Sequence, residues 1–427
     1  MIQRSIILFA ALFALFAVVG WVLGAANITL LLVQSFAMAL MALGLNIQWG
    51  YGGLFNFGIM GFLMLGGFAV TFISYPVNPS FWGSEGPWML GRALLAFAAG
   101  ALLVYGARQS ERLGIRGGWK SFVTVLAWFV AYVIYRSQID PAAAYIEANA
   151  GFVGGLGAHP VLGWLFGGVL AAVIAFIVGK IALGLRTDYL AIATIGISEI
   201  IRALIKNMDW LTRGTLTVSP IPWPTPLPQD YQATGSDMVS SLLLARGGFL
   251  LLAIAVLAIC IWLISRAYAG PWGRMMRAIR DNHIAAASMG KNVTARQLEI
   301  FVFGSVLMGI GGAMLVSFTQ IFDPSSYQPI NHTFLIWVMI IVGGAGNNWG
   351  AVFGAVLIWL VWVISEPLSK VIFDMVSYWS TNIGWGAIPE IESRSAQMRV
   401  FVLGLVITIA LRFAPKGLIP EVVRRDA

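Results

Sequence analysis

Residues 247–268, GGFLLLAIAVLAICIWLISRAY, run directly into residues 269–297, AGPWGRMMRAIRDNHIAAASMGKNVTARQ, and this contrast decides the fold. The first stretch is almost entirely apolar over the ~20 residues that cross a hydrocarbon core of roughly 30 Å. The second stretch is too polar and too basic to lie in lipid. Together they are typical of a membrane-spanning helix that emerges into an aqueous loop.

The composition extends this interpretation to the whole chain of 427 residues. Hydrophobic residues make up 59% of the chain and charged residues only 10%, whereas soluble domains carry about 25% charged residues. A water-soluble fold cannot bury this much apolar side chain, so most of the chain must be dissolved in a bilayer. The apolar runs show no sustained alternation with period two, which favours helices over a β-barrel.

The apolar runs predict an all-α, polytopic membrane helical bundle of about 11–12 transmembrane helices, in a single domain over residues 1–427. The first run is longer than the ~7–15 apolar residues of a signal peptide, which favours an uncleaved helical hairpin over a cleaved leader. Residues 121–136 and 332–346 are short enough to be tilted or re-entrant. The expected spans are residues 5–25, 28–48, 54–75, 88–106, 121–136, 159–183, 189–206, 247–268, 298–320, 332–346, 349–366 and 398–414.

The basic residues predict which side of the membrane each loop faces. The net charge is +8, but there is no soluble basic domain, so the positive-inside rule explains it better than a nucleic-acid partner does. When the N-terminus is placed in the cytoplasm and the spans alternate, most lysines and arginines fall on the cytoplasmic side. We therefore expect both termini and the loop 269–297 to be cytoplasmic.

The sequence lacks the motifs of an enzyme. It has no Walker A pattern, no dinucleotide fingerprint, no catalytic Cys/His pair and no paired carboxylates that suggest hydrolysis. With Cys260 as the single cysteine and only three histidines, a metal site is not expected. We predict no catalytic residue and no cofactor. If the chain is part of an energised machine, the energy comes from another subunit or from an ion gradient.

The loop 269–297 has the pattern of two short helices. Gly270-Pro271 breaks the preceding helix, and Arg274 to Arg280 reads as a short basic amphipathic helix. Residues 283–289 form a second, alanine-rich turn or two, which Gly290 can end in the left-handed conformation. The loop is a docking surface or a solvated loop whose arginines only fix topology. Its length, far beyond the ~2–8 residues that bundle connections need, favours docking.

Residues 277–290, RAIRDNHIAAASMG, resemble the cytoplasmic loop of the branched-chain amino acid ABC transporter permease family. In such importer permeases an Ala-Ala-x-x-x-Gly element forms a coupling helix that sits on the ATPase subunit. Ile284 replaces the glutamate of the general importer motif. The resemblance implies that the ATPase-docking residues are Arg277, Arg280, Asp281, Ala285, Ala286, Ser288 and Gly290.

Three further stretches resemble the same family. They are residues 46–58, NIQWGYGGLFNFG, residues 185–202, LRTDYLAIATIGISEIIR, and residues 343–350, GGAGNNWG. The resemblance covers about residues 28–420. Residues 86–140 have no counterpart in a minimal member, so we expect an extra hairpin there.

The resemblance implies a multi-pass permease subunit of an ABC importer in the bacterial inner (plasma) membrane, which provides a path for branched-chain amino acids. It also implies two ABC ATPase subunits, a second homologous permease, a periplasmic solute-binding protein and surrounding membrane lipid. The alternatives are a gradient-driven secondary transporter or channel, or an ABC permease for urea or short amides. A gradient-driven carrier needs coupling carboxylates or histidines on several spans, and this chain offers mainly Glu199.

Several polar residues within the spans are candidates for the translocation path or gate. Glu199 lies about 15 Å into its predicted helix, and Arg202, three residues later, can pair with it. A gate and a structural ion pair are equally good explanations. For the glycine-rich stretches, helix packing is the simpler explanation. The candidates are Glu199, Arg202, Asn46, Asn56, Gly343, Gly344, Gly346 and Asn347.

Two segments are expected on the outer side. Residues 207–246 form a periplasmic loop in which prolines alternate from Pro220 to Pro228, which bars a helix there. The loop is either a spacer or a rim that meets an external partner. Residues 368–385 are amphipathic and aromatic, as in a helix that lies flat on the membrane surface.

Overall fold

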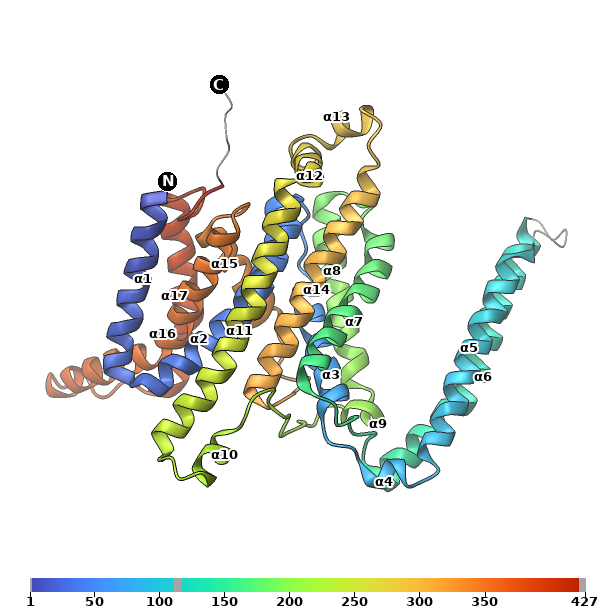
Figure 1. Ribbon diagram of the computed structural model, residues 1–427, viewed down its shortest axis with the longest axis horizontal. Helices are drawn as coiled ribbons and strands as arrows, with labels where there is room; N and C mark the ends of the chain where they lie inside the picture. The colour runs from blue at the N-terminus through green and yellow to red at the C-terminus, as the bar shows by residue number, and fades with distance from the viewer. Residues whose placement is uncertain (1, 111–116, 422–427) are drawn as a thin grey trace.

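The computed structural model describes residues 2–110 and 117–421, and this part of the chain is a bundle of helices without a β-strand (Figure 1). Met1, residues 111–116 and residues 422–427 lie outside the described part. These residues include Arg112, Arg116, Arg424 and Arg425, which the positive-inside argument places on the cytoplasmic side. The elements are α1 (Ile2–Leu23), α2 (Ala25–Leu45), η1 (Asn46–Tyr51), α3 (Ile59–Ser74), α4 (Pro79–Trp82), α5 (Gly86–Arg108), α6 (Gly118–Ala150), α7 (Pro160–Ala182), α8 (Thr187–Lys206), α9 (Asp209–Thr212), α10 (Pro228–Ala233), α11 (Met238–Ala269), α12 (Pro271–Asp281), α13 (His283–Ser288), α14 (Val293–Thr319), η3 (Ile330–Phe334), α15 (Leu335–Gly343), α16 (Asn348–Asn382) and α17 (Ile391–Phe413).

The predicted all-α membrane bundle is confirmed. Among the described residues, nine helices are long and apolar enough to cross a membrane. The remaining three predicted spans correspond to α3, α8 and the η3–α15 pair, which are shorter or less apolar. Hydropathy identifies these helices because each must bury its apolar side chains in lipid or in the bundle while satisfying its own backbone hydrogen bonds.

Several predicted boundaries were wrong. Helix α11 begins at Met238, inside the loop expected over residues 207–246, and α17 begins at Ile391, seven residues before the expected start. The span expected from residue 54 begins at Ile59, because the chain from Gly52 to Gly58 is not helical. The span expected at 121–136 belongs to the 33-residue helix α6, which continues past its apolar part with an Arg136–Asp140 ion pair one turn apart. Helix α16 does not end near residue 366 but continues through Pro367 to Asn382.

The core is a set of closely packed helices around α2, α3, α7 and α14. Three glycines bring their backbones together, since a Cβ on Gly66 of α3 would overlap the carbonyl oxygen of Gly309 of α14. A Cβ on Gly309 would lie 2.6 Å from the carbonyl oxygen of Gly167 of α7. Small residues of this kind let membrane helices approach closely and pack by van der Waals contact.

This junction predicts a large difference between two glycine substitutions. Gly309→Val should lower the free energy of unfolding by about 1–3 kcal/mol, because the new side chain forces α7 and α14 apart. The measurement is the midpoint of thermal unfolding of the purified protein in detergent. Gly91→Val is the control, because a Cβ at Gly91 in α5 meets nothing within 4 Å. Equal midpoints for the two variants would contradict the close packing.

The region predicted as an extra hairpin forms helices α5 and α6, which project away from the bundle in Figure 1. The two helices pack on each other where Gly100 lies against Ala131, and α4 and α9 hold their base. Both helices carry exposed apolar side chains, including Leu95, Phe97 and Phe122. The hairpin therefore has a surface suited to lipid or to another membrane protein.

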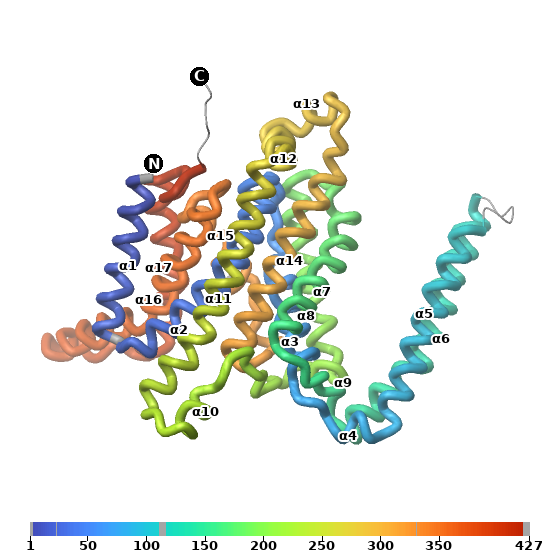
Figure 2. The backbone as a smooth tube through the Cα atoms, viewed as in Figure 1, coloured from blue at the N-terminus to red at the C-terminus, as the bar shows by residue number. Residues whose placement is uncertain are grey.

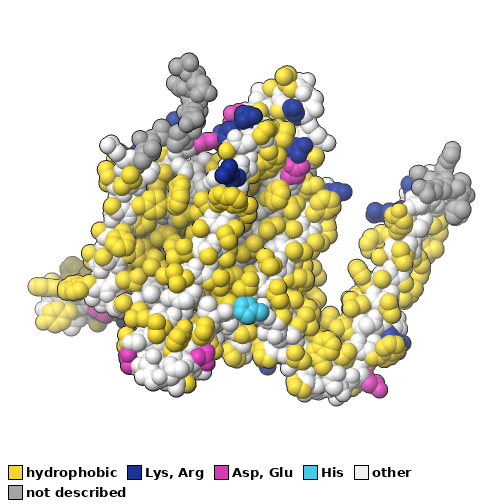
Figure 3. All heavy atoms as spheres, viewed as in Figure 1, with side chains coloured by type: hydrophobic (Ala, Val, Ile, Leu, Met, Phe, Trp, Pro, Cys, Tyr) yellow, Lys and Arg dark blue, Asp and Glu magenta, His cyan; other side chains and the backbone are white. Residues whose placement is uncertain are grey.

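The molecule has two distinct ends. The N-terminal end of α1 and helices α12 and α13 lie at one end, and α4, α9 and α10 lie at the other (Figure 2). On the face shown in Figure 3, lysines and arginines gather mainly at the α12–α13 end, and the flank between the ends is mostly apolar. This arrangement is typical of a multi-pass membrane protein with a positive side.

The second half of α16 runs across the direction of the bundle (Figure 1). Pro367 lies inside this helix. Beside it Glu366 pairs with Arg399 of α17, and Lys370 pairs with Glu392 at 3.1 Å. Its exposed apolar residues match the amphipathic segment predicted to lie along the membrane surface. They include Leu368, Ile372, Met375 and Trp379.

Candidate functional site

Helices α12 and α13 form the loop between α11 and α14, as the sequence predicts. Pro271 occupies the first turn of α12, and the Asn282 side chain accepts a hydrogen bond of 3.0 Å from the backbone N–H of Ala285 at the start of α13. Gly290 follows α13 with a φ of +74°, which confirms the predicted left-handed stop. Local sequence signals therefore mark the ends of both short helices, while Met276, Ile279 and Ala286 pack their inner sides on the core.

Helix α13 stands clear of the bundle at the tip of the molecule (Figure 1). Ile284 is 69% exposed and Met289, directly after the helix, is 80% exposed. Ala285 and Ser288 are also exposed, whereas Ala286 points inward and is buried. Single exposed apolar side chains are common on protein surfaces, but two of them on one short helix and its end offer an apolar contact for a partner groove. The sequence patterns did not single out Ile284 and Met289 as contact residues.

Arg280 at the end of α12 turns away from this exposed tip and reaches into the protein. Its Nη1 donates a hydrogen bond of 2.7 Å to the carbonyl oxygen of Gly50 and one of 2.9 Å to the carboxylate of Glu421. Burial lowers the pKa of the Arg280 guanidinium, but hydrogen bonding and charge from Glu421, with a smaller contribution from Asp281, raise it above the ordinary value. Arg280 therefore stays charged and anchored.

The other predicted docking residues differ in exposure. Asp281 pairs with the Nε of Arg280 at 3.2 Å and remains 68% exposed. Ser288 donates its hydroxyl to the carbonyl of Ile284 at 3.1 Å. Arg277 is half-buried on α12.

The two glycine-rich stretches meet in one buried cluster. The carbonyl oxygen of the Asn46 side chain accepts a hydrogen bond of 2.8 Å from the N–H of Gly346, and its amide donates one of 3.2 Å to Asn348. Asn347 begins α16 by accepting from the N–H of Trp349 at 3.0 Å. Asn46 is fully buried, so this cluster is a packed joint between η1 and the start of α16.

Gly343 and Gly344 shape the turn beside this joint. A Cβ on Gly343 would overlap the carbonyl oxygen of Gly350, and Gly344 has a φ of +120°, which side chains disfavour. Asn348 accepts a second hydrogen bond from the hydroxyl of Tyr51 at 3.2 Å and donates to Ser265 at 3.3 Å. The sequence patterns missed Tyr51 and Ser265, because the contacts join distant parts of the chain.

Asn56 belongs to a separate buried network. Its amide donates to Gln48 at 2.8 Å, and Gln48 in turn donates to the carbonyl of Phe301 at 2.8 Å and to Ser305 at 3.1 Å. The backbone carbonyl oxygen of Asn56 accepts a hydrogen bond of 3.1 Å from the indole N–H of Trp337. All these amide groups are satisfied inside the bundle, so Asn56 holds α3, α14 and α15 together in this structure.

Glu199 and Arg202 form an ion pair of 3.1 Å on α8. The Glu199 side chain is 41% exposed and the Arg202 side chain 25% exposed. Helix α8 packs on α3 and α7, whereas Asn46 packs against α16 and its start. The predicted path residues therefore divide into a buried joint at Asn46 and Gly343–Asn347, a buried network at Asn56, and a half-exposed pair on α8.

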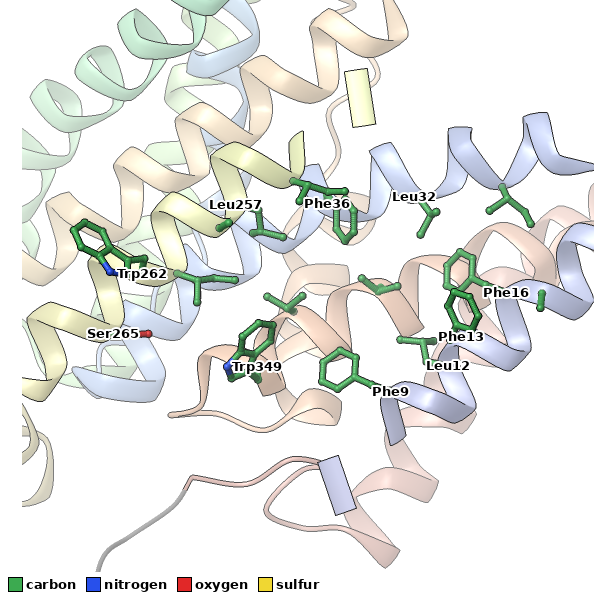
Figure 4. A pocket seen from close by; sticks show the side chains of 17 residues that line it. Phe9, Leu12, Phe13, Phe16, Leu32, Phe36, Leu257, Trp262, Ser265 and Trp349 are labelled. Carbon is green, nitrogen blue, oxygen red and sulfur yellow. The ribbon is translucent and has the colours of Figure 1, made fainter. Parts of the chain in front are cut away.

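A cavity of about 980 Å³ forms an apolar groove between α1, α2, α11 and α16 (Figure 4). Phe9, Leu12 and Phe16 face Leu257 and Trp262 across it, and Ser265 supplies one of its few polar atoms. A zwitterionic solute in this groove would lose its hydration without gaining polar partners, which costs several kcal/mol. The groove is therefore suited to acyl chains and not to an amino acid.

No group of three or more His, Cys, Asp or Glu side chains is placed to hold an ion in residues 2–110 and 117–421. Cys260 is a buried free thiol.

The chain matches a family model described as branched-chain amino acid transport system / permease component over residues 27–136 and 118–411. It is 29% identical over 214 residues to the high-affinity branched-chain amino acid transport system permease protein LivM of Escherichia coli (strain K12), covering 48% of this chain and 49% of that protein. It is 25% identical over 258 residues to the probable branched-chain amino acid transport permease protein LivM of Methanocaldococcus jannaschii, covering 59% and 67%.

A shorter similarity, 28% over 110 residues, links the chain to the fructose import permease protein FrcC of Rhizobium meliloti, covering 25% of this chain and 30% of that protein. The chain spans about half the length of the E. coli relative that it matches. No solved structure matches the chain.

Proposed function

The chain belongs to the branched-chain amino acid transport permease family, and from this premise we propose that it is the membrane-spanning permease subunit of an ABC importer. It provides the path for the solute, and separate ATPase subunits supply the energy. The observation that carries the proposal is helix α13, which stands beyond the spanning helices with Ile284 and Met289 exposed. An exposed helix tip with apolar side chains can fill a groove on a partner.

The surroundings of α13 fit a cytoplasmic ATPase subunit as that partner. The basic residues Arg277 and Lys291 flank the helix and can pair with carboxylates at the rim of a groove. The basic residues gathered at this end (Figure 3) support a cytoplasmic location for it and for both termini in a bacterial inner membrane. Two ATPase subunits complete the complex, one beneath this chain and one beneath a second permease.

The outward face of α8 is the best candidate for the path. Tyr189, Ile192, Gly196 and Ala203 share this face with Glu199, and all but Glu199 are classed as exposed. A half-exposed carboxylate near the middle of a span is costly in lipid. The face therefore fits a hydrated path shared with a second, homologous permease better than it fits acyl chains, and Gly196 and Ala203 allow close approach.

Glu199→Gln tests this assignment. Without the carboxylate, Arg202 loses its partner inside the membrane, and we expect uptake to fall about tenfold, which corresponds to about 1.4 kcal/mol in the rate-limiting barrier. The measurement is initial uptake of leucine into proteoliposomes that contain the whole complex. Asp188→Asn, at the exposed start of the same helix, is the control. Unchanged uptake with Glu199→Gln at equal expression would leave only a structural role for the ion pair.

The opposite end carries a rim suited to a periplasmic solute-binding protein. The proline-rich loop is not a loose spacer, because Val218 pairs with Phe322 in an isolated β-bridge and Ile221 is fully buried. The indole of Trp223 stacks on Phe318 and donates to its carbonyl at 3.2 Å. A rim held this firmly can present a constant surface to an external partner.

The relatives guide the choice of solute. Two of them are named for branched-chain amino acids and one for fructose, so family membership alone permits more than one solute class. We propose leucine, isoleucine or valine as the solute, because the relatives with the longer matches are named for the transport of branched-chain amino acids.

The proposed function is tested by isolating the chain from native membranes and reconstituting the complex. We expect ATPase subunits and a second permease to co-purify, and uptake of branched-chain amino acids to require ATP and a binding protein. Competition by excess urea or short amides should leave that uptake unchanged. Uptake by the lone chain without ATP would contradict the proposal and support a gradient-driven carrier.

A further inference from the structure

The chain after α17 forms a strap, residues 414–421, that lies against the glycine turn before α16. The N–H groups of Leu418 and Ile419 donate hydrogen bonds of 2.8 Å to the carbonyls of Val342 and Gly343. The side-chain amide of Asn347 donates to the carbonyl of Pro420 at 3.1 Å. The strap and the turn therefore form one packed unit.

The strap leads to Glu421, which meets Arg280 of α12. The two side chains are 22% and 21% exposed, and the same Nη1 atom that binds Glu421 also donates to the carbonyl of Gly50. A Cβ on Gly53 would touch the Arg280 side chain at 3.4 Å, so the arginine also packs on the segment after η1. The guanidinium of Arg280 thus joins α12 to η1 and to the strap, three segments that are distant in sequence.

Hydrogen bonds continue from this point into the core. Gly346, which follows the glycine turn, lies against the Glu421 carboxylate and donates its N–H to Asn46. Tyr51 of η1 donates to Asn348 and stacks on Tyr268 at 3.8 Å between ring centres. Tyr268 lies in the last turn of α11, three residues before α12 begins, so these contacts return to the helix pair that carries Arg280.

This ion pair differs from the others in the described part of the chain. The pairs Arg136–Asp140, Arg202–Glu199 and Arg296–Glu299 each join two turns of one helix, whereas Lys370–Glu392 and Arg399–Glu366 join α16 to α17 at the crosswise segment. Within the described residues, Arg280–Glu421 is the ion pair that connects the α12–α13 loop to segments outside it. Because it joins α12 to the strap, this ion pair is suited to transmit a movement of α12 to the strap, whereas an ion pair within one helix only stabilises that helix.

We propose that Arg280 is a positioning residue that couples α12 and α13 to the joint formed by η1, the glycine turn and the strap. Hydrogen bonds of 2.7 and 2.9 Å do not survive a shift of about 1 Å, so any displacement of α12 must carry η1 and Glu421 with it or break these bonds. Movement imposed on α13 thereby reaches α2 and α16, which are continuous with the joint. This inference rests on the proposed function, because it names the route by which an ATPase acts.

The test compares Arg280→Gln, Glu421→Gln and the double variant in the reconstituted complex, with ATP hydrolysis and solute uptake measured together. We expect each single variant to retain ATPase co-purification and hydrolysis while uptake per ATP falls at least fivefold. The double variant should be no worse than either single variant, because residues that act as one unit give non-additive effects. Arg280→Lys, which keeps the charge, should recover part of the uptake.

The matched control is Lys370→Gln with Glu392→Gln, which removes an ion pair that also joins two segments but lies on the crosswise segment. This control should leave uptake per ATP unchanged. Wild-type uptake per ATP in both single variants, or additive losses in the double variant, would overturn the coupling role and leave the importer assignment intact. A wild-type complex without an ATPase, or with ATP-independent uptake, would instead remove the proposed function and this inference with it.

Discussion

Replacing Ile284 with aspartate is expected to abolish ATP-driven uptake while the protein still folds. Ile284 is 69% exposed at the tip of α13, so its side chain contributes little to the packing of the bundle. If it fills a groove on an ATPase subunit, burying a carboxylate there costs more than about 2 kcal/mol of binding free energy, as at interface hot spots. We expect less than a tenth of the wild-type amount of ATPase to co-purify.

Ile284→Leu provides the matched control, because it keeps an apolar side chain of the same volume. This variant should bind ATPase and drive uptake at close to wild-type levels. Thermal unfolding of both variants in detergent should match the wild type. Normal uptake with Ile284→Asp would show that α13 does not dock through its exposed apolar tip.

Replacing Asn348 with leucine is expected to give a large loss of stability. Its buried side chain accepts hydrogen bonds from Asn46 and Tyr51, which are also buried, and donates one to the exposed Ser265. Leucine is similar in size but leaves these polar partners unsatisfied, and each buried group without a partner costs about 1–3 kcal/mol. Thermal unfolding and the yield of folded protein from membranes measure the effect.

Asn382→Leu is the control for this substitution. Asn382 ends the same helix and is exposed, so its replacement should change the midpoint of unfolding little. An equally small effect for Asn348→Leu would mean that water or another group replaces the lost hydrogen bonds, and that the joint is not the rigid unit described above.

Hydropathy and charge predicted the helices well because the bilayer imposes them one segment at a time. The helix stop at Gly290 was predictable for a similar reason, since a left-handed residue after a short helix is a local requirement. The length of α6 was not predictable from hydropathy, because polar residues such as Arg136 and Asp140 continue a helix without any apolar signal.

The contacts of the site depend on residues that are distant in sequence. Arg280 and Glu421 are 141 residues apart, and Arg280 and Gly50 are 230 apart. No local pattern indicates that an arginine in a docking loop turns inward, or that a carboxylate near the end of the chain receives it. The resemblance identified the stretches around Asn46 and Gly343 separately, and only the folded chain shows that they form one joint.

The most direct test of the account is crosslinking from α13 in native membranes. A cysteine at Met289, in a Cys260→Ala background that removes the other thiol, would be treated with a short thiol-to-amine crosslinker. The account predicts an adduct between this chain and an ATPase subunit, and the adduct should be absent with Ile284→Asp. Efficient labelling of Met289→Cys by a small reagent, with no ATPase adduct, would contradict the claim that an ATP-driven partner binds this helix.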